Sequence, residues 1–180
     1  MAKKKTEISK LKIVQFGHPA LRAKTKNLSK AEIASPEIQR LVVKMFTTMD
    51  KIGVGLAAPQ IGQSLQLAVI EIKPTANRPD LENFPKTVII NPKIIAYGPK
   101  SEKWEACLSL DGVWGKAQRS QWVKVSYTDL KGQLHQEKYS GFPAHVFQHE
   151  IDHLNSTLFV DRIKDYKTLV SVDELHRFMS

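Results

Sequence analysis

The segment HEIDH at positions 149–153 constrains the fold of this 180-residue chain more than any other feature. On an α-helix, residues four positions apart lie about 40° apart around the axis and about one turn apart along it. His149 and His153 can therefore reach one cation, and zinc and iron(II) both accept imidazole nitrogens as ligands. Glu150 lies on the adjoining side of the helix, where a carboxylate can take a proton from a water molecule that a metal has acidified. The segment predicts a helix with a metal and a general base on one side.

The neighbouring residues distinguish a metal-binding helix from two histidines that merely share an exposed face. One side of the predicted helix, residues 143–154, carries four apolar residues: Val146, Phe147, Ile151 and Leu154. This stripe predicts a helix that packs against a core while its histidines face a cleft. His145 continues the row of histidines by one turn, but three ligands from three successive turns would strain the geometry. We therefore expect His145 to lie beside the site without binding the metal.

The site needs a third protein ligand from elsewhere in the chain. Cys107, in a region of predicted turns and short strands, is the strongest soft ligand, because a thiolate beside a cation is deprotonated and firmly held. As the single cysteine it has no internal disulfide partner, and a small buried packing residue is the other interpretation. Glu174 is an alternative ligand, which would make the protein a metalloprotease of the HExxH type. The residues alone leave these alternatives open.

The remaining elements predict an α+β fold, because strands in hairpin order accompany few helices. Ser35 and Pro36 predict the start of a helix, and apolar residues at three- and four-residue spacing continue it to Met49. β-Branched residues and alternation predict three strands, over residues 65–72, 87–95 and 121–128. We also expect an exposed loop, a hairpin turn and a short helix, over residues 73–86, 129–132 and 173–178 respectively.

Length and composition predict a single domain over residues 1–180. A chain of this length with 42% hydrophobic residues can bury one sizeable core. No stretch approaches the roughly 20 consecutive apolar residues of a membrane helix, and the N-terminus lacks the apolar segment of a secretory signal or a convincing transit peptide. We therefore expect a protein of the bacterial cytoplasm with no membrane partner.

The formal charge of +9 is concentrated near the N-terminus, because residues 1–30 hold nine Lys or Arg and one acid, Glu7. The rest of the chain is close to neutral, which argues against a surface that binds nucleic acid sequence-specifically. We expect residues 1–10 to be a flexible basic tail. Such a tail can contribute to transient contact with ribosomal RNA.

Three segments, taken in order along the chain, resemble the peptide deformylase family. They are GVGLAAPQ at positions 53–60, EACLS at 105–109 and QHEIDH at 148–153. The resemblance spans nearly the whole chain and implies antiparallel sheets packed around a central metal-binding helix. It also implies that Cys107, His149 and His153 bind one divalent ion. Family members are usually iron(II) enzymes in the cell, and they accept zinc, nickel or cobalt.

The activity that the resemblance implies is hydrolysis of the N-terminal formyl group of formyl-methionyl nascent peptides, by an enzyme that we expect to be a monomer. Glu150 is then the general base and acid, while the Gln60 amide and the Leu108 backbone N–H stabilise charge on the formyl oxygen. Gly55 lets a substrate backbone lie beside the chain as an added strand. An apolar pocket for the methionine side chain would include Val54, Phe142 and Val146.

Two positions depart from the family pattern. Ala106 stands where the family almost always has glycine, which costs about 1 kcal/mol if positive φ is required and nothing in a β conformation. Trp114 stands where some relatives have arginine, so it either favours apolar residues further along the peptide or is an ordinary half-buried tryptophan. These departures also allow a deformylase-like binding protein without activity. Arg119 is either an exposed side chain or a partner of Glu105 that braces the cysteine segment.

Overall fold

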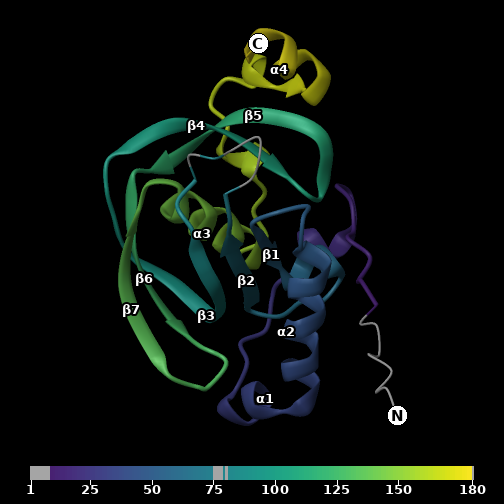
Figure 1. The fold of residues 1–180 in the computed structure, drawn as a ribbon, viewed down its shortest axis with the longest axis vertical. Coiled ribbons are helices and arrows are strands. Elements are labelled where there is room, and N and C mark those ends of the chain that lie inside the picture. Colours follow the sequence, from purple (N-terminus) through teal and green to yellow (C-terminus); the bar gives the residue numbers. More distant parts are fainter. Residues whose placement is uncertain (1–8, 75–78, 80, 180) are drawn as a thin grey trace.

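The computed structural model describes residues 9–74, 79 and 81–179, and these residues form two antiparallel sheets (Figure 1). The basic tail expected over residues 1–10 lies almost entirely outside the described residues. The first sheet has the strand order β1-β2-β3-β6-β7, with bounds Gly55–Ala57 (β1), Leu67–Ile72 (β2), Phe84–Tyr97 (β3), Trp122–Thr128 (β6) and Leu134–Ser140 (β7). The second has the order β4-β5-β8, with bounds Lys100–Cys107 (β4), Leu110–Ser120 (β5) and Val170–Ser171 (β8). The α+β prediction is confirmed.

The α-helices of the described segments are α1 (Lys30–Ala34), α2 (Pro36–Met49), α3 (Gly141–Leu154) and α4 (Val172–Met179). α2 begins where predicted, because the Ser35 side chain accepts a hydrogen bond from the Ile38 N–H and a proline occupies the first turn. α3 begins two residues before its predicted start, and α4 is one residue longer at each end than predicted. In the described part of the chain, no helix is long and apolar enough to span a membrane.

The five-stranded sheet has a core on each face, one formed with α3 and the other with α2. Strand β2 shows the reason, since its sequence LAVIEI is apolar on both faces and successive side chains enter opposite cores. Ile70 and Ile72 pack in the same cluster as Phe147 of α3. Val69 packs with Met45 of α2 on the other face. Full burial of an aromatic side chain such as Phe147 contributes about 2–3 kcal/mol.

Helix α3 lies centrally, between the five-stranded sheet and the β4–β5 hairpin that folds over it (Figure 1). It contacts strands of both sheets, including β1, β2, β6 and β7 of the first and β5 of the second. Its apolar stripe, predicted from the sequence, faces the five-stranded sheet. The polar side of α3 therefore faces the β4–β5 hairpin.

The three predicted strands are present as β2, β3 and β6, but the other five strands, β1, β4, β5, β7 and β8, were missed. A loop was predicted over residues 73–86, but β3 already begins at Phe84. Within that predicted loop, residues 75–78 and 80 lie outside the described residues. The expectation of turns and short strands around Cys107 was wrong, because the long strands β4 and β5 occupy that region. The sequences of β4 (KSEKWEAC) and β7 (LHQEKYS) are rich in charged and polar residues because most of their side chains are exposed. The predicted hairpin turn is confirmed, since the Gly132 N–H donates to the Asp129 carbonyl at 3.0 Å.

Candidate metal centre

Two elements far apart in the sequence bring three ligand-type atoms together. α3 contributes His149 and His153, whose Nε2 atoms lie 3.1 Å apart. Cys107, the last residue of β4, places its Sγ 3.2 Å from His153 Nε2. Across the described segments, this is the one group of three His, Cys, Asp or Glu side chains whose ligand atoms all lie within 4.8 Å of one another.

The spacing and chemistry of these atoms fit one divalent ion. Ligands at the usual zinc distances of about 2.0–2.3 Å are roughly 3.3–3.6 Å apart at tetrahedral angles, close to the separations found here. One thiolate and two imidazoles suit zinc, iron(II), cobalt or nickel. Cys107 and His153 are 7% and 1% exposed, so the ligand atoms are largely shielded from bulk water. Three protein ligands leave a tetrahedral position open for water or substrate.

Glu105 on β4 orients the His149 ring. Its Oε1 accepts a hydrogen bond from His149 Nδ1, and the Arg119 guanidinium and His145 also donate to it. Burial opposes ionisation of Glu105, but the charge of His149 and the donated hydrogen bonds hold the pKa of this carboxyl well below its ordinary value. An ionised Glu105 can only accept, so His149 Nδ1 carries a proton in either state of the ring. When the ring is neutral, its lone pair is therefore on Nε2, the atom that a metal would bind.

Arg119 and Glu105 form a buried ion pair, so of the two alternatives for Arg119 the pairing is confirmed and the exposed side chain is wrong. Arg119 Nε and Nη2 donate to the two Glu105 oxygens at 2.9 and 2.7 Å, and Arg119 is 3% exposed. Arg119 Nη1 also donates to Asp152 of the HEIDH segment at 2.5 Å. Asp152 in turn accepts a hydrogen bond from Arg162 Nη2 at 2.6 Å. This network ties β4 and β5 to α3, and so ties the thiol to the paired histidines.

Glu150 is buried beside the three candidate ligands, and its environment shifts its pKa. It is 3% exposed, and its Oε2 has no hydrogen-bond partner among the described residues. Burial raises the pKa of Glu150 to about 7. A carboxyl group with a pKa near neutrality can both accept and return a proton under physiological conditions.

Gly55 makes room for the Glu150 carboxylate. A Cβ atom at position 55 would lie 2.2 Å from Glu150 Oε1 and 2.6 Å from its Cδ. No side chain other than hydrogen is compatible with that approach, and Glu150 is too enclosed to move aside freely. Gly55 also belongs to β1, which is an edge strand of the five-stranded sheet. The absence of a side chain at position 55 therefore leaves space for the Glu150 carboxylate, in addition to the role at an open strand edge that the sequence predicted.

We expect Gly55→Ala to lower turnover by about 100-fold, because a displacement of about 1 Å in a catalytic group has an effect of that size. The metal should be retained, since the substitution contacts none of the three ligands. The shorter side chain of Glu150→Asp would relieve the clash, so the double variant should lose less activity than the product of the two single losses. Steady-state kinetics and metal analysis check this expectation. Independent, multiplicative losses would show that the clash does not matter.

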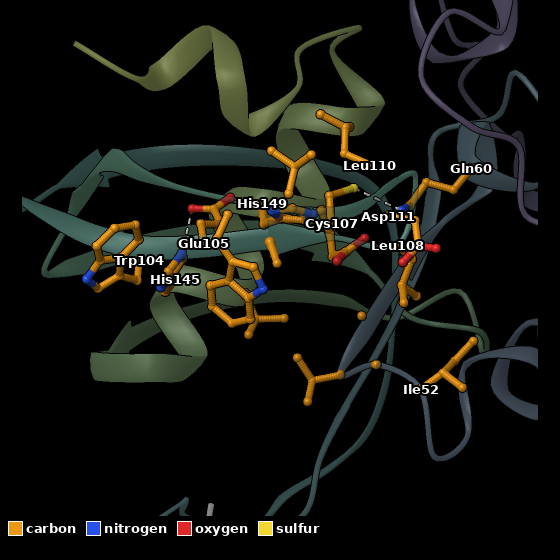
Figure 2. Close-up of a pocket in the computed structure, with 18 of the residues that line it drawn as sticks. Ile52, Gln60, Trp104, Glu105, Cys107, Leu108, Leu110, Asp111, His145 and His149 are labelled. Atoms are coloured by element: carbon orange, nitrogen blue, oxygen red, sulfur yellow. Dashed lines mark hydrogen bonds and ion pairs between the residues drawn. The ribbon is translucent and has the colours of Figure 1, made fainter. Parts of the chain in front are cut away.

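Gln60 is held with its amide N–H₂ toward the thiol. Its Oε1 accepts a hydrogen bond from the Ala57 N–H at 2.8 Å, and its Nε2 lies 3.5 Å from Cys107 Sγ and 3.4 Å from Ser109 Oγ. Gln60 is only 1% exposed, so these contacts set the orientation of the amide. Leu108, in the turn between β4 and β5, lies on the same side of the pocket (Figure 2).

A pocket of about 440 Å³ opens beside the ligands (Figure 2). Cys107, His149 and Glu150 line it. The structure also brings to this pocket every substrate-binding residue that the sequence analysis identified: Val54, Gly55, Phe142, Val146 and Trp114. Trp104 and Ala106, on the same hairpin, line it as well, and the sequence analysis assigned neither a place in the pocket.

The structure resolves three further sequence expectations. Ala106 lies in β4, and positive φ among described non-glycine residues is confined to other positions, so this alanine carries no backbone strain. Its partner across the hairpin is Trp114. Glu174 pairs with Arg177 on α4 at 2.7 Å and is not among the three clustered ligands, so the metalloprotease arrangement is wrong. His145 lies beside the site, as expected, and is not one of the clustered ligands.

The contact of Glu105 with His145 and His149 was missed by the sequence analysis. A signal was present, because residues two positions apart on a strand face the same side. Glu105 precedes Cys107 by two positions, so a strand assignment for this segment would have placed both side chains toward α3. The segment was not recognised as a strand, and the contact was therefore not inferred.

The site combines a Cys-His-His cluster able to hold a metal with a buried carboxyl group beside one pocket, an arrangement typical of metal-dependent hydrolases. The sequence model of the polypeptide deformylase family matches residues 10–169. The chain therefore belongs to the polypeptide deformylase family.

Individual relatives agree with this assignment. Peptide deformylase 2 of Nostoc sp. is 36% identical over 172 residues, which cover 94% of this chain and 95% of the relative. The peptide deformylase of Thermotoga neapolitana is 40% identical over 157 residues, 86% of this chain and 88% of the relative. Among solved structures, the Met-Ala-Ser-bound class I type b peptide deformylase of Acinetobacter baumannii superposes with a TM-score of 0.83 at 34% identity, covering 87% of this chain and 99% of that chain. The Synechococcus elongatus peptide deformylase, in complex with actinonin, gives a TM-score of 0.79 at 36% identity, covering 93% of this chain and 86% of that chain.

Proposed function

We propose that this enzyme removes the formyl group from the N-terminus of formyl-methionyl nascent polypeptides and releases formate. One observation carries the proposal: Cys107, His149, the buried Glu150 carboxyl and the Gln60 amide all line one pocket, and His153 lies directly behind Cys107 and His149 in the same cluster. These are the groups that hydrolysis of a small amide requires, namely a cation site, a proton shuttle and a donor for the carbonyl oxygen.

Cys107, His149 and His153 would hold a single divalent ion, and we propose iron(II) as the native one. The thiolate and imidazole donors, together with family membership, support this choice, and zinc, nickel or cobalt suit the same donors. When bound, the ion supplies Lewis acidity, which polarises a carbonyl and lowers the pKa of water to about 7.

Glu150 moves the protons of the reaction. Its carboxylate accepts a proton from the attacking water, and the same group then donates a proton to the leaving amine as the bond to the formyl carbon breaks. The pKa of about 7 suits both steps, because the two protonation states are then nearly equally stable at neutral pH. The oxygen without a partner, Oε2, is free to take the proton.

Gln60 and Leu108 stabilise the negative charge that develops on the formyl oxygen. The amide of Gln60 is fixed by its contacts with Ala57 and Ser109, so its orientation costs little reorganisation during the reaction. The Leu108 backbone N–H is the second donor in this proposal. Loss of one such donor typically raises a barrier by about 3 kcal/mol.

The substrate backbone lies along the edge of β1, beside Gly55, and the first side chain enters the apolar part of the pocket. Val54, Phe142 and Val146 line that part, and their aliphatic and aromatic surfaces suit the unbranched methionine thioether. Trp114 contacts residues further along the peptide and favours apolar ones. The Met-Ala-Ser complex of the A. baumannii relative supports a methionine at the first position.

The cellular setting is part of the proposal. We propose a monomer of one catalytic domain, acting in the bacterial cytoplasm on chains as they leave the ribosome. The bacterial origin of the curated relatives supports this setting. The nine basic residues among positions 1–30 would assist a transient, salt-sensitive contact with ribosomal RNA.

The test is an assay of formyl-Met-Ala-Ser with iron-loaded protein in the absence of oxygen and with nickel-loaded protein. We expect stoichiometric release of formate and of Met-Ala-Ser with a free amino group. Acetyl-Met-Ala-Ser is the matched control and should react far more slowly, because its extra methyl group must fit beside Gly55 and Glu150. Elemental analysis of protein purified without oxygen should find iron. If neither loaded form released formate, the proposed function would be refuted, and the alternative of a deformylase-like binding protein without activity would be favoured.

A further inference from the structure

His145 lies one helical turn before His149, and it also contacts Glu105. Its Nε2 lies 2.6 Å from Glu105 Oε2 (Figure 2). The His145 side chain is 12% exposed and lines the pocket, with the Phe142 ring packed edge-on at 6.0 Å between ring centroids. The proposed mechanism gives His145 no role, although it joins the pocket wall to the carboxylate that orients a ligand.

The Glu105 carboxylate has four donors for its four lone-pair sites. Oε1 accepts from Arg119 Nη2 at 2.7 Å and from His149 Nδ1. Oε2 accepts from Arg119 Nε at 2.9 Å and from His145 Nε2 at 2.6 Å. An ionised carboxylate has about four acceptor positions, so this set is complete. Removing any one donor leaves a lone pair unsatisfied at a site that is only 4% exposed.

His145 and His149 occupy different oxygens of the same carboxylate. Arg119 donates to both oxygens, but this one guanidinium still lets the plane of the carboxylate tilt. The His145 contact on Oε2 opposes that tilt, and so keeps Oε1 directed at His149 Nδ1. The direction of Oε1 sets the tautomer and the rotation of the His149 ring, whose Nε2 faces the other two ligands.

We propose that His145 is a positioning residue for the metal centre, which acts by donating its Nε2–H to Glu105 and thereby holding the His149 ring in its ligand orientation. The proposal rests on the proposed metal site at Cys107, His149 and His153. In addition, it connects that site to the substrate pocket, because His145 lines the pocket and also contacts Glu105. Groups that hydrogen-bond a metal ligand typically change metal affinity or activity by about 10- to 100-fold. Glu105 is such a group for His149, and His145 acts through it.

The test compares His145→Leu with His145→Gln. Both substitutions remove the ring contact with Phe142, but only glutamine keeps an N–H donor at a similar distance from the backbone. We expect cobalt- or zinc-loaded His145→Leu to release its metal to a chelator about 10- to 100-fold faster than the parent, whereas His145→Gln stays within about threefold. The absorption bands of the cobalt form should shift in the leucine variant and be largely restored in the glutamine variant. Neither readout requires turnover.

His135→Leu is the matched control. His135 also donates to a carboxylate, that of Asp129 at 3.0 Å, and its ring stacks on Tyr127, but it does not line the pocket. We expect its metal release and cobalt spectrum to equal those of the parent. Thermal melting of all variants separates a loss of fold from a loss of ligand orientation. Equal metal release from the leucine and glutamine variants, both folded, would overturn the role of the N–H.

A measurement on the unsubstituted protein keeps the proposal testable if the leucine variant does not fold. Nitrogen-15 NMR of the zinc-loaded parent should find a proton on His145 Nε2 and a proton on His149 Nδ1. A bare His145 Nε2 would overturn the proposal, whatever the variants show. A parent protein that binds no metal would instead refute the proposed metal site, so the two failures are distinguishable.

Discussion

Glu150→Gln should lower formate release by about 10²- to 10⁴-fold while leaving the metal and the fold in place, which is the range expected for removal of a general acid–base group. Glutamine has nearly the same shape but cannot accept the proton of the attacking water. Glu150 contributes no atom to the three-ligand cluster, so metal content should not change. Loss of a buried carboxyl group whose Oε2 has no partner should not lower the melting temperature.

The measurement is kcat/KM for formyl-Met-Ala-Ser, together with metal content and thermal melting. Glu37→Gln on α2 is the matched control, since it makes the same chemical change at an exposed position and should keep parent activity. A Glu150→Gln enzyme that works within about threefold of the parent would place the proton transfer elsewhere, because even modest general catalysis exceeds that factor.

Cys107→Ala should weaken metal binding by more than about 100-fold, because it removes a ligand, and even outer partners of a metal are worth 10- to 100-fold. Two imidazoles from a single helix would remain, without the thiolate that completes the group. Activity should fall with the metal. Dialysis against a chelator followed by elemental analysis gives the affinity.

Two further variants sharpen this expectation. Ala106→Gly changes the adjacent residue, which has an ordinary β conformation, and should retain the metal. Glu174→Ala should also retain it, because Glu174 pairs with Arg177 on α4 rather than with the histidines. Metal retained by Cys107→Ala and lost by Glu174→Ala would reverse the ligand assignment and restore the metalloprotease alternative.

Much of the site could be predicted because its chemistry is encoded in short segments. Two histidines four positions apart define one side of a helix, whatever the rest of the chain does. The apolar stripe of α3, with Phe147 and Ile151, likewise predicted which side faces the core. The cysteine ligand was different, since the residues left Cys107 and Glu174 as alternatives and only the family resemblance favoured the thiol.

The missed strands have a physical explanation. β4 and β7 carry many charged and polar side chains because much of their surface meets solvent, so their sequences lack the β-branched runs that revealed β2 and β3. β5 is largely buried, but its sequence LDGVWGKAQRS combines two glycines with buried polar residues such as Arg119, so it lacks such a run as well. A strand of this kind is stabilised by pairing with its neighbour rather than by its own composition. The β4–β5 pairing extends from Lys100 with Ser120 to Cys107 with Leu110, and no local pattern records it.

The sequence by itself determined the paired histidines, the adjacent Glu150 and the helix that carries them, because those relations follow from the period of a helix. Only the tertiary structure decided that Cys107 meets the histidines, that Gly55 lies against Glu150, and that four donors converge on Glu105. The contacts of Cys107 and Gly55 join residues more than 30 positions apart, and the donors to Glu105 on β4 come from two other elements, β5 and α3. Such contacts depend on how whole elements pack, and no spacing along the chain contains that information.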